Sequence, residues 1–282
     1  MTPDRPPFTG VVVGIDGAPD GLYATEWAAR EAARRGTPLT VVFVREYYEA
    51  LLPPEQYDAL LGEAERFLTE ATEAARAKAP GLDVVAVAVD GAAAEELTDR
   101  TAGAALLVVG SRGRGGFARL LLGSVADKVL RAAACPAVVV RAGGDPAGPV
   151  AVGVHPDADM DAALGFAFAE AARLDRPVWA LHCIVVPVGV LPPFGAPQVL
   201  MPGVDEHEAE KRVETVLAAW RDRYPGVPVT TSARVDSPAA MLVDASPRAA
   251  LMVLGGRARR HALGTLTAQV AHHASCPVAL VR

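Results

Sequence analysis

Short apolar runs alternate along this chain with longer segments in which apolar residues recur at helical spacing. In the first half the apolar runs are rich in valine and uninterrupted, which is typical of parallel β-strands covered on both faces. They lie near Gly10–Ile15, Leu39–Val44, Val84–Val89, Leu106–Val109 and Ala137–Val140. Strands that alternate with helices predict right-handed βαβ units and an open, doubly wound parallel sheet.

Three segments between these runs have helical patterns. The first follows the spacing of Ala24, Ala28 and Ala32, and the second, Pro54–Lys78, is a long charged stretch with a solvated outer face. The third begins at Ser124, which stands where an N-cap residue is expected before an apolar stripe. In a doubly wound sheet, ligands bind beyond the carboxyl ends of the strands, where the strand order reverses.

The second half of the chain repeats the first. Four stretches match in the same order, among them "VVVGIDGAPDGLYATEWAARE" with "VAVGVHPDADMDAALGFAFAE" and "CPAVVVR" with "CPVALVR". We therefore expect two homologous domains, residues 1–143 and 150–282, joined by a Gly/Pro-rich linker over residues 144–149.

Composition and charge narrow the class of protein. The 282 residues are 51% hydrophobic and 21% charged, which suits packed cores and not disorder. A net charge of −6 argues against sequence-independent binding of nucleic acid. The sequence contains three cysteines and its start is unlike a signal peptide, which predicts a cytoplasmic protein. Its apolar runs are too short to cross a bilayer, so no membrane span is expected.

The stretch "GSRGRGGFARLLLGS", from Gly110 to Ser124, follows the fourth predicted strand and opens the last helix of the first half. Glycines let backbone N–H groups approach an anion, and a helix N-terminus favours phosphate. Arg112, Arg114 and Arg119 add positive charge. The alternatives are a phosphate cradle and a solvated turn that is merely rich in Gly and Arg; its position favours the cradle.

Asp16 ends the first predicted strand, at the same edge of the sheet. Its carboxylate is a candidate acceptor for a purine amine or a ribose hydroxyl. The other interpretation is an aspartate that accepts from its own backbone at a helix start. Together with the glycine loop, the ligand role is the better hypothesis.

These residues resemble the universal stress protein family. The pattern Gly110-x2-Gly113-x9-Gly123-Ser124 is similar to its nucleotide-binding motif, Asp16 to its adenine-side aspartate, and "LLLGSVADKVLRAAACPAVVVR" to its last helix and strand. The resemblance implies two tandem open five-stranded parallel-sheet domains of the α/β class, of the adenine nucleotide alpha hydrolase-like type. It further implies ATP binding with little turnover and a role in tolerance of stress.

The residues expected around the nucleotide follow from this resemblance and from the loop charges. Gly14 and Asp16 are expected by the adenosine, Val44 would contact the base through its backbone, and the other positions surround the ribose and phosphates. Those positions are Gly110, Arg112, Gly113, Arg114, Gly115, Gly123, Ser124 and Val125. Whether Mg²⁺ accompanies ATP is left open.

The second half departs from the pattern. His155 replaces Asp16, Ala258 replaces Gly113, and only four positions separate Arg259 from Gly264, where eight separate Arg114 from Gly123. A loop this much shorter cannot follow the same path around a triphosphate, and a neutral His lacks the acceptors of a carboxylate. We expect the first domain alone to bind ATP in this way.

The remaining features leave other classes open. No nucleophile–base set emerges, so efficient catalysis is not expected; the alternatives to a regulatory module are an ATP pyrophosphatase or adenylating enzyme and a nucleotide-free scaffold. No metal site is expected at His272, His273 and Cys276. The apolar last strands of the two halves predict pairing as an intrachain pseudo-dimer, with a homodimer of whole chains left open. Residues 186–204 form a lid, a partner contact or a plain loop.

Overall fold

The computed structural model describes residues 7–46, 53–114, 121–185, 206–256 and 264–282. The chain forms two compact units, one of residues 1–143, 256–273 and 277–282, the other of residues 144–255 and 274–276. The predicted sequence domains, 1–143 and 150–282, are defined by the repeat and stay a prediction. The predicted loop over residues 186–204 lies outside the described residues.

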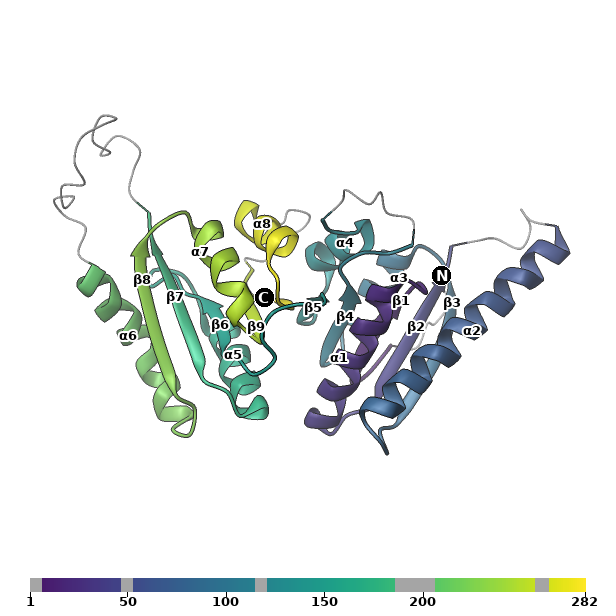
Figure 1. Cartoon of the computed structure of the whole chain (residues 1–282), viewed down its shortest axis with the longest axis horizontal. Coiled ribbons are helices and arrows are strands. Elements are labelled where there is room, and N and C mark those ends of the chain that lie inside the picture. Colours follow the sequence, from purple (N-terminus) through teal and green to yellow (C-terminus); the bar gives the residue numbers. More distant parts are fainter. Residues whose placement is uncertain (1–6, 47–52, 115–120, 186–205, 257–263) are drawn as a thin grey trace, which may run out of the picture. The chain divides into compact units, whose positions relative to one another are not determined.

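The first unit is a doubly wound α/β sheet (Figure 1). Its strand order is β3-β2-β1-β4-β5-β10; β1 to β5 pair in parallel, and β10 pairs antiparallel with β5. Helix α1 packs against α2, and α3 packs against α4. In chain order the elements are β1 (Val11–Ile15), α1 (Pro19–Arg35), β2 (Leu39–Arg45), α2 (Pro54–Lys78), β3 (Val84–Asp90), α3 (Ala93–Asp99), β4 (Leu106–Gly110), α4 (Ser124–Ala132), β5 (Ala137–Val140), α8 (Thr265–His273) and β10 (Val278–Val281).

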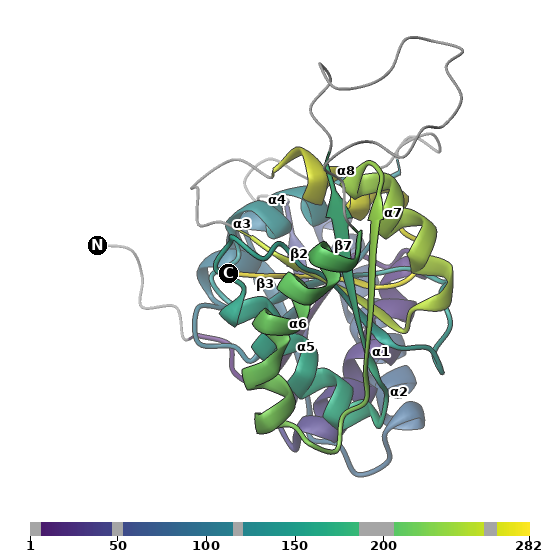
Figure 2. The ribbon, with the colours of Figure 1, turned by 90° about the vertical axis from the view of Figure 1, so that its left-hand side faces the viewer.

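The second unit repeats the parallel arrangement, with the order β9-β6-β7-β8. Figure 2 shows α5 and α6 on one side of β7 and α7 on the other. Its elements are β6 (Val150–Gly153), α5 (Asp161–Leu174), β7 (Val178–Ile184), α6 (Glu206–Arg223), β8 (Val229–Val235), α7 (Pro238–Ala245), a 3₁₀ turn (Ser246–Arg248) and β9 (Leu251–Gly255). The predicted α/β fold with parallel strands is confirmed in both units.

Burial follows strand position in the sheet. The first three residues of β1 and of β4 are fully buried, as the continuous apolar runs predict. The prediction that every run is covered on both faces is wrong for β3, where Val85 is 47% exposed. The reason is topological: β3 is the edge strand, which the hydrophobicity of its sequence does not reveal. No helix in the described ranges is long and apolar enough to cross a bilayer.

Corresponding helices of the two halves end in the same backbone conformation but with different residues. Helix α1 is followed by its C-cap residue Gly36, whose φ of 63° lets its N–H donate to the carbonyls of Ala32 and Ala33. Helix α5 is followed by its C-cap residue Asp175, whose φ of 53° lies in the same left-handed region. Glycine adopts this conformation without a Cβ penalty, whereas an aspartate there is strained.

Two arginines at strand ends cap helices within the first unit. Arg141, after β5, donates to the carbonyls of Ala271 and of His272, the latter at 2.8 Å. Arg282, after β10, donates to the carbonyls of Leu130, Arg131 (3.0 Å) and Ala133 (2.8 Å). The last carbonyls of a helix have no partner within it, and a cation there also opposes the negative end of the helix dipole.

The Asp175→Gly variant should be more stable than the wild type by about 0.5–1 kcal/mol, because glycine removes the left-handed strain at the end of α5. Urea unfolding measures the change. The reverse exchange, Gly36→Asp, should destabilise by a similar amount. If both variants changed the free energy of unfolding in the same direction, this interpretation would be contradicted.

Arg282→Ala should lower the free energy of unfolding by about 1–2 kcal/mol, because the last carbonyls of α4 lose a charged donor. Arg131→Ala is the matched control. Arg131 pairs with Asp127 across one partly solvent-accessible helix turn at 2.8 Å, so its loss should cost about 0.5 kcal/mol or less. Urea denaturation of the full chain compares the two, and a smaller effect for Arg282→Ala would refute the capping role.

Candidate functional site

The central strands β1 and β4 end side by side and bring the candidate residues to one edge of the sheet. Gly14 of β1 pairs with Val109 of β4, so Asp16 and Gly110 leave neighbouring strands at nearly the same level. A Cβ on Gly110 would come within 2.9 Å of the backbone carbonyl group of Asp20. The turn after β4 thus packs against the first turn of α1, and only glycine fits there.

The glycine loop is closed at its base by its own backbone. The N–H of Gly123 donates to the carbonyl of Ser111 at 2.7 Å, and the N–H of Ser111 donates to Val140 of β5 at 3.0 Å. A Cβ on Gly123 would lie 3.5 Å from Cα of Arg112. The start and the end of the loop are therefore adjacent, which places the first turn of α4 beside Gly113.

The carboxylate of Asp16 ties two segments together. Its Oδ1 accepts from the N–H of Ala18 at 3.0 Å, and its Oδ2 accepts from the N–H of Arg114 at 2.7 Å. A Cβ on Gly113 would stand 2.4 Å from Oδ2, so only a glycine allows this approach. Asp16 thus organises its own turn and holds the start of the loop, while its role toward a ligand stays a prediction, for which each carboxylate oxygen has a further lone pair.

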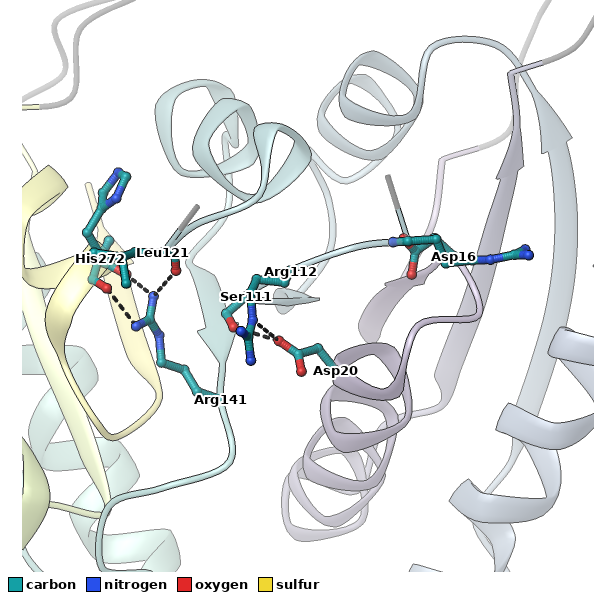
Figure 3. Close-up of polar contacts among 9 residues, drawn as sticks. Asp16, Asp20, Ser111, Arg112, Leu121, Arg141 and His272 are labelled. Atoms are coloured by element: carbon teal, nitrogen blue, oxygen red, sulfur yellow. Dashed lines mark hydrogen bonds and ion pairs between the residues drawn. The ribbon is translucent and has the colours of Figure 1, made fainter. Parts of the chain in front are cut away.

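Asp20 belongs to the same network, although the sequence did not single it out. Its Oδ2 accepts from the hydroxyl of Ser111 at 2.7 Å and lies 3.5 Å from Nε of Arg112 (Figure 3). The usable signal was its place one turn after Asp16, in the first turn of a helix that follows a strand end. What sequence could not supply was the packing of that turn on β4.

The two described loop arginines are both paired with carboxylates. Arg112 contacts Asp20, and the guanidinium of Arg114 donates to Oε1 of Glu63 on α2 at 2.7 Å. This bond, together with the charge of Arg114, keeps the pKa of the Glu63 carboxyl below its usual value. Glu63 is a second residue that the sequence did not indicate, because nothing local shows which strand end α2 lies beside.

The start of α4 differs by one residue from the prediction. Gly123, with extended backbone, is the N-cap, and Ser124 is the first residue of the helix and not its cap. Helix bonds reach back four residues, so the N–H groups of Ser124 and Val125 have no partner inside α4. These N–H groups and the hydroxyl of Ser124 lie at the positive end of the helix dipole, which favours an anion; their role in binding one stays a prediction.

Of the remaining predicted residues, the structure describes Val44 and Gly14. Val44 is half-buried and lies one residue beyond the last pair between β1 and β2, Ile15 with Phe43. A Cβ on Gly14 would come 2.6 Å from Leu97 of α3, so this glycine has a packing role that needs no ligand. Gly115 lies outside the described residues, as does Arg119.

In the second half, His155 performs part of the role of Asp16. Its Nδ1 accepts from the N–H of Asp157 at 3.3 Å, two residues on, as Oδ1 of Asp16 accepts from Ala18. Its ring lies edge-on to His182 at 6.3 Å. A neutral imidazole that accepts at Nδ1 donates at Nε2, so it has no second acceptor to hold a loop N–H. Ala258 and Arg259 lie outside the described residues.

The described part of the chain contains no group of three or more His, Cys, Asp or Glu side chains arranged to hold a metal ion. Cys135 is buried, and this burial raises the pKa of its thiol. A thiol with a raised pKa stays protonated and is a poor nucleophile.

Comparisons with known proteins place this architecture. The family model described as "Universal stress protein family" matches residues 7–141 and again 147–282. The chain is 34% identical over 295 residues to universal stress protein Rv2005c of Mycobacterium tuberculosis, covering 97% of each chain. It is 34% identical over 291 residues to universal stress protein Rv2623 of the same organism, covering 97% of this chain and 96% of that one.

Solved structures agree on the fold. A universal stress protein from Archaeoglobus fulgidus superposes with a TM-score of 0.70 at 19% identity, over 96% of this chain and 95% of that one. A second structure, from Pseudomonas aeruginosa, superposes with a TM-score of 0.57 at 14% identity, over 96% of this chain and 92% of that one. With the family model matching twice over nearly the whole length, the chain is a tandem member of the universal stress protein family.

Proposed function

We propose that the first half of this chain binds ATP and that the protein acts as a nucleotide-holding regulatory module in stress tolerance. The observation that carries the proposal is the approach of Gly113 to Asp16, which ties the glycine loop to the end of β1. Through it, the loop, the start of α4 and an acidic strand end all meet at the carboxyl edge of the sheet. That edge is where doubly wound folds bind nucleotides.

Different groups of the site suit different parts of the nucleotide. The N–H groups at the start of α4 and the hydroxyl of Ser124 suit the phosphates, because they offer donors at the positive end of a helix dipole. Asp16 retains acceptor capacity for the nucleoside, and Val44 presents backbone at the end of β2. The choice of ATP among adenine nucleotides rests on the resemblance of the loop motif.

A holding role fits this arrangement better than rapid turnover. The polar side chains described at this edge are those of carboxylates, arginines and the serines Ser111 and Ser124, and the first half of the sequence contains no histidine that could act as a general base for a serine. Oxygen donors for Mg²⁺ would come from Asp16, Asp20 and the phosphates themselves.

We expect one ATP per chain, because His155 cannot hold a loop N–H as Asp16 does. Equilibrium dialysis of the full chain with labelled ATP measures the stoichiometry, and analysis of nucleotide released on denaturation identifies what co-purifies. A stoichiometry near two would show that the second half also binds. Absence of any adenine nucleotide binding would remove the proposal, and rapid release of pyrophosphate would support the enzyme alternative.

Gly113→Ala should weaken ATP binding by at least about tenfold, since its Cβ would push the Asp16 carboxylate away from the N–H of Arg114. Gly103→Ala is the matched control, because a Cβ there meets nothing within 4 Å and lies at the amino end of β4. Titration calorimetry compares the two, with urea unfolding as a check on folding. Equal affinities for the two variants would falsify the role of Gly113.

A further inference from the structure

The backbone and the side chain of Arg114 are held by different carboxylates. Its backbone N–H is bound to Asp16 at the crevice, whereas its guanidinium is bound to Glu63 of α2. The side chain thus places a positive charge within reach of the loop, yet that charge is already neutralised by a carboxylate. A nucleotide phosphate that recruits Arg114 must compete with Glu63.

The position of Arg114 is fixed by an aromatic ring as well as by the carboxylate. Its guanidinium lies over Phe67, 4.8 Å from the ring centroid, and this ring stacks on Phe43 at 5.9 Å. A Cβ on Gly17 would come within 2.4 Å of Phe67, so the ring is packed against the turn that follows Asp16. The guanidinium of Arg114 can therefore stay stacked on the Phe67 ring whether it is paired with Glu63 or with a phosphate.

Glu63 is well placed to compete with a phosphate. Its pKa is lowered mainly by the hydrogen bond from Arg114, with a further contribution from the charge of Arg66, whose Nη2 lies 3.9 Å away. The carboxylate is therefore ionised at neutral pH. It also lies on a shallow, open depression along the first half of α2.

We propose that Glu63 sets the affinity and charge preference of this nucleotide site by holding Arg114 in an ion pair that phosphate must replace. The inference rests on the proposed function. Because a carboxylate repels phosphate in proportion to the charge of the phosphate chain, Glu63 disfavours ATP more than AMP. Arg114 gains a phosphate oxygen only as it releases Glu63, and Phe67 keeps it in place during the exchange.

The test is titration calorimetry of the full chain with ATP, ADP and AMP. Glu63→Gln keeps the shape and removes the charge, so ATP should bind about three- to tenfold more tightly. ADP should show an intermediate gain, and AMP should change less than about twofold. The gain for ATP should shrink as salt is raised, because partly exposed charges are screened.

Glu65→Gln is the matched control. It removes the same charge from the same helix, but Glu65 is exposed and lies two residues along, so it projects from another side of α2. Its effect on ATP affinity should stay below about twofold. In an Arg114→Gln background, the additional Glu63→Gln change should lose most of its effect on ATP, because the pair it acts through is gone.

The outcomes separate the two proposals. If the wild-type chain binds no adenine nucleotide, the proposed function fails and this inference with it. If the wild type binds ATP but Glu63→Gln leaves the affinity unchanged, weakens it, or strengthens AMP as much as ATP, the role of Glu63 is wrong while the nucleotide site stands. A tighter ATP complex that disappears in the Arg114→Gln background supports the exchange.

Discussion

The carboxylate of Asp16 is the contact on which the geometry of the site depends. It joins the turn after β1 to the loop after β4, two segments far apart in sequence, through hydrogen bonds to the N–H groups of Ala18 and Arg114. A charged acceptor bound to backbone N–H groups is stronger than a neutral one, and here it acts at the end of a buried sheet. Without it, the start of the glycine loop would lose its attachment to β1.

The glycines around the Asp16 contact have different structural roles. Gly113 leaves room for the Asp16 carboxylate, Gly110 leaves room for the backbone of Asp20, and Gly123 closes the loop onto Ser111. Gly14 instead accommodates Leu97 on α3. A glycine-rich motif is therefore not one functional unit: some positions shape the loop, and one supports the packing of a helix on the sheet.

The two halves show how a repeated fold can diverge at a site. His155 reproduces the local hydrogen bond of Asp16 to the residue two positions on, which preserves the turn, but a single free ring nitrogen that donates cannot replace the second carboxylate oxygen. The helix-end exchange of Gly36 for Asp175 is of the same kind, since the backbone conformation persists while its most suitable residue is lost. In both places the fold is kept and local chemistry changes.

The order of elements, the parallel sheet and the family were accessible from sequence, because valine runs, helical spacing and a spaced glycine motif are local signals. Helix α2 was predicted at its observed bounds, Pro54–Lys78. The exposure of β3, the cap position of Gly123 and the partners of Arg112 and Arg114 were not accessible in this way. Each depends on which distant segment lies alongside: the edge strand β3 has no charged residue before Asp90 that would mark it as an edge, and Asp20 and Glu63 meet the loop only when α1 and α2 pack on the sheet. The sequence by itself determined which glycines and charged side chains the loop contains, and tertiary packing decided which of their charges are already neutralised by a neighbour.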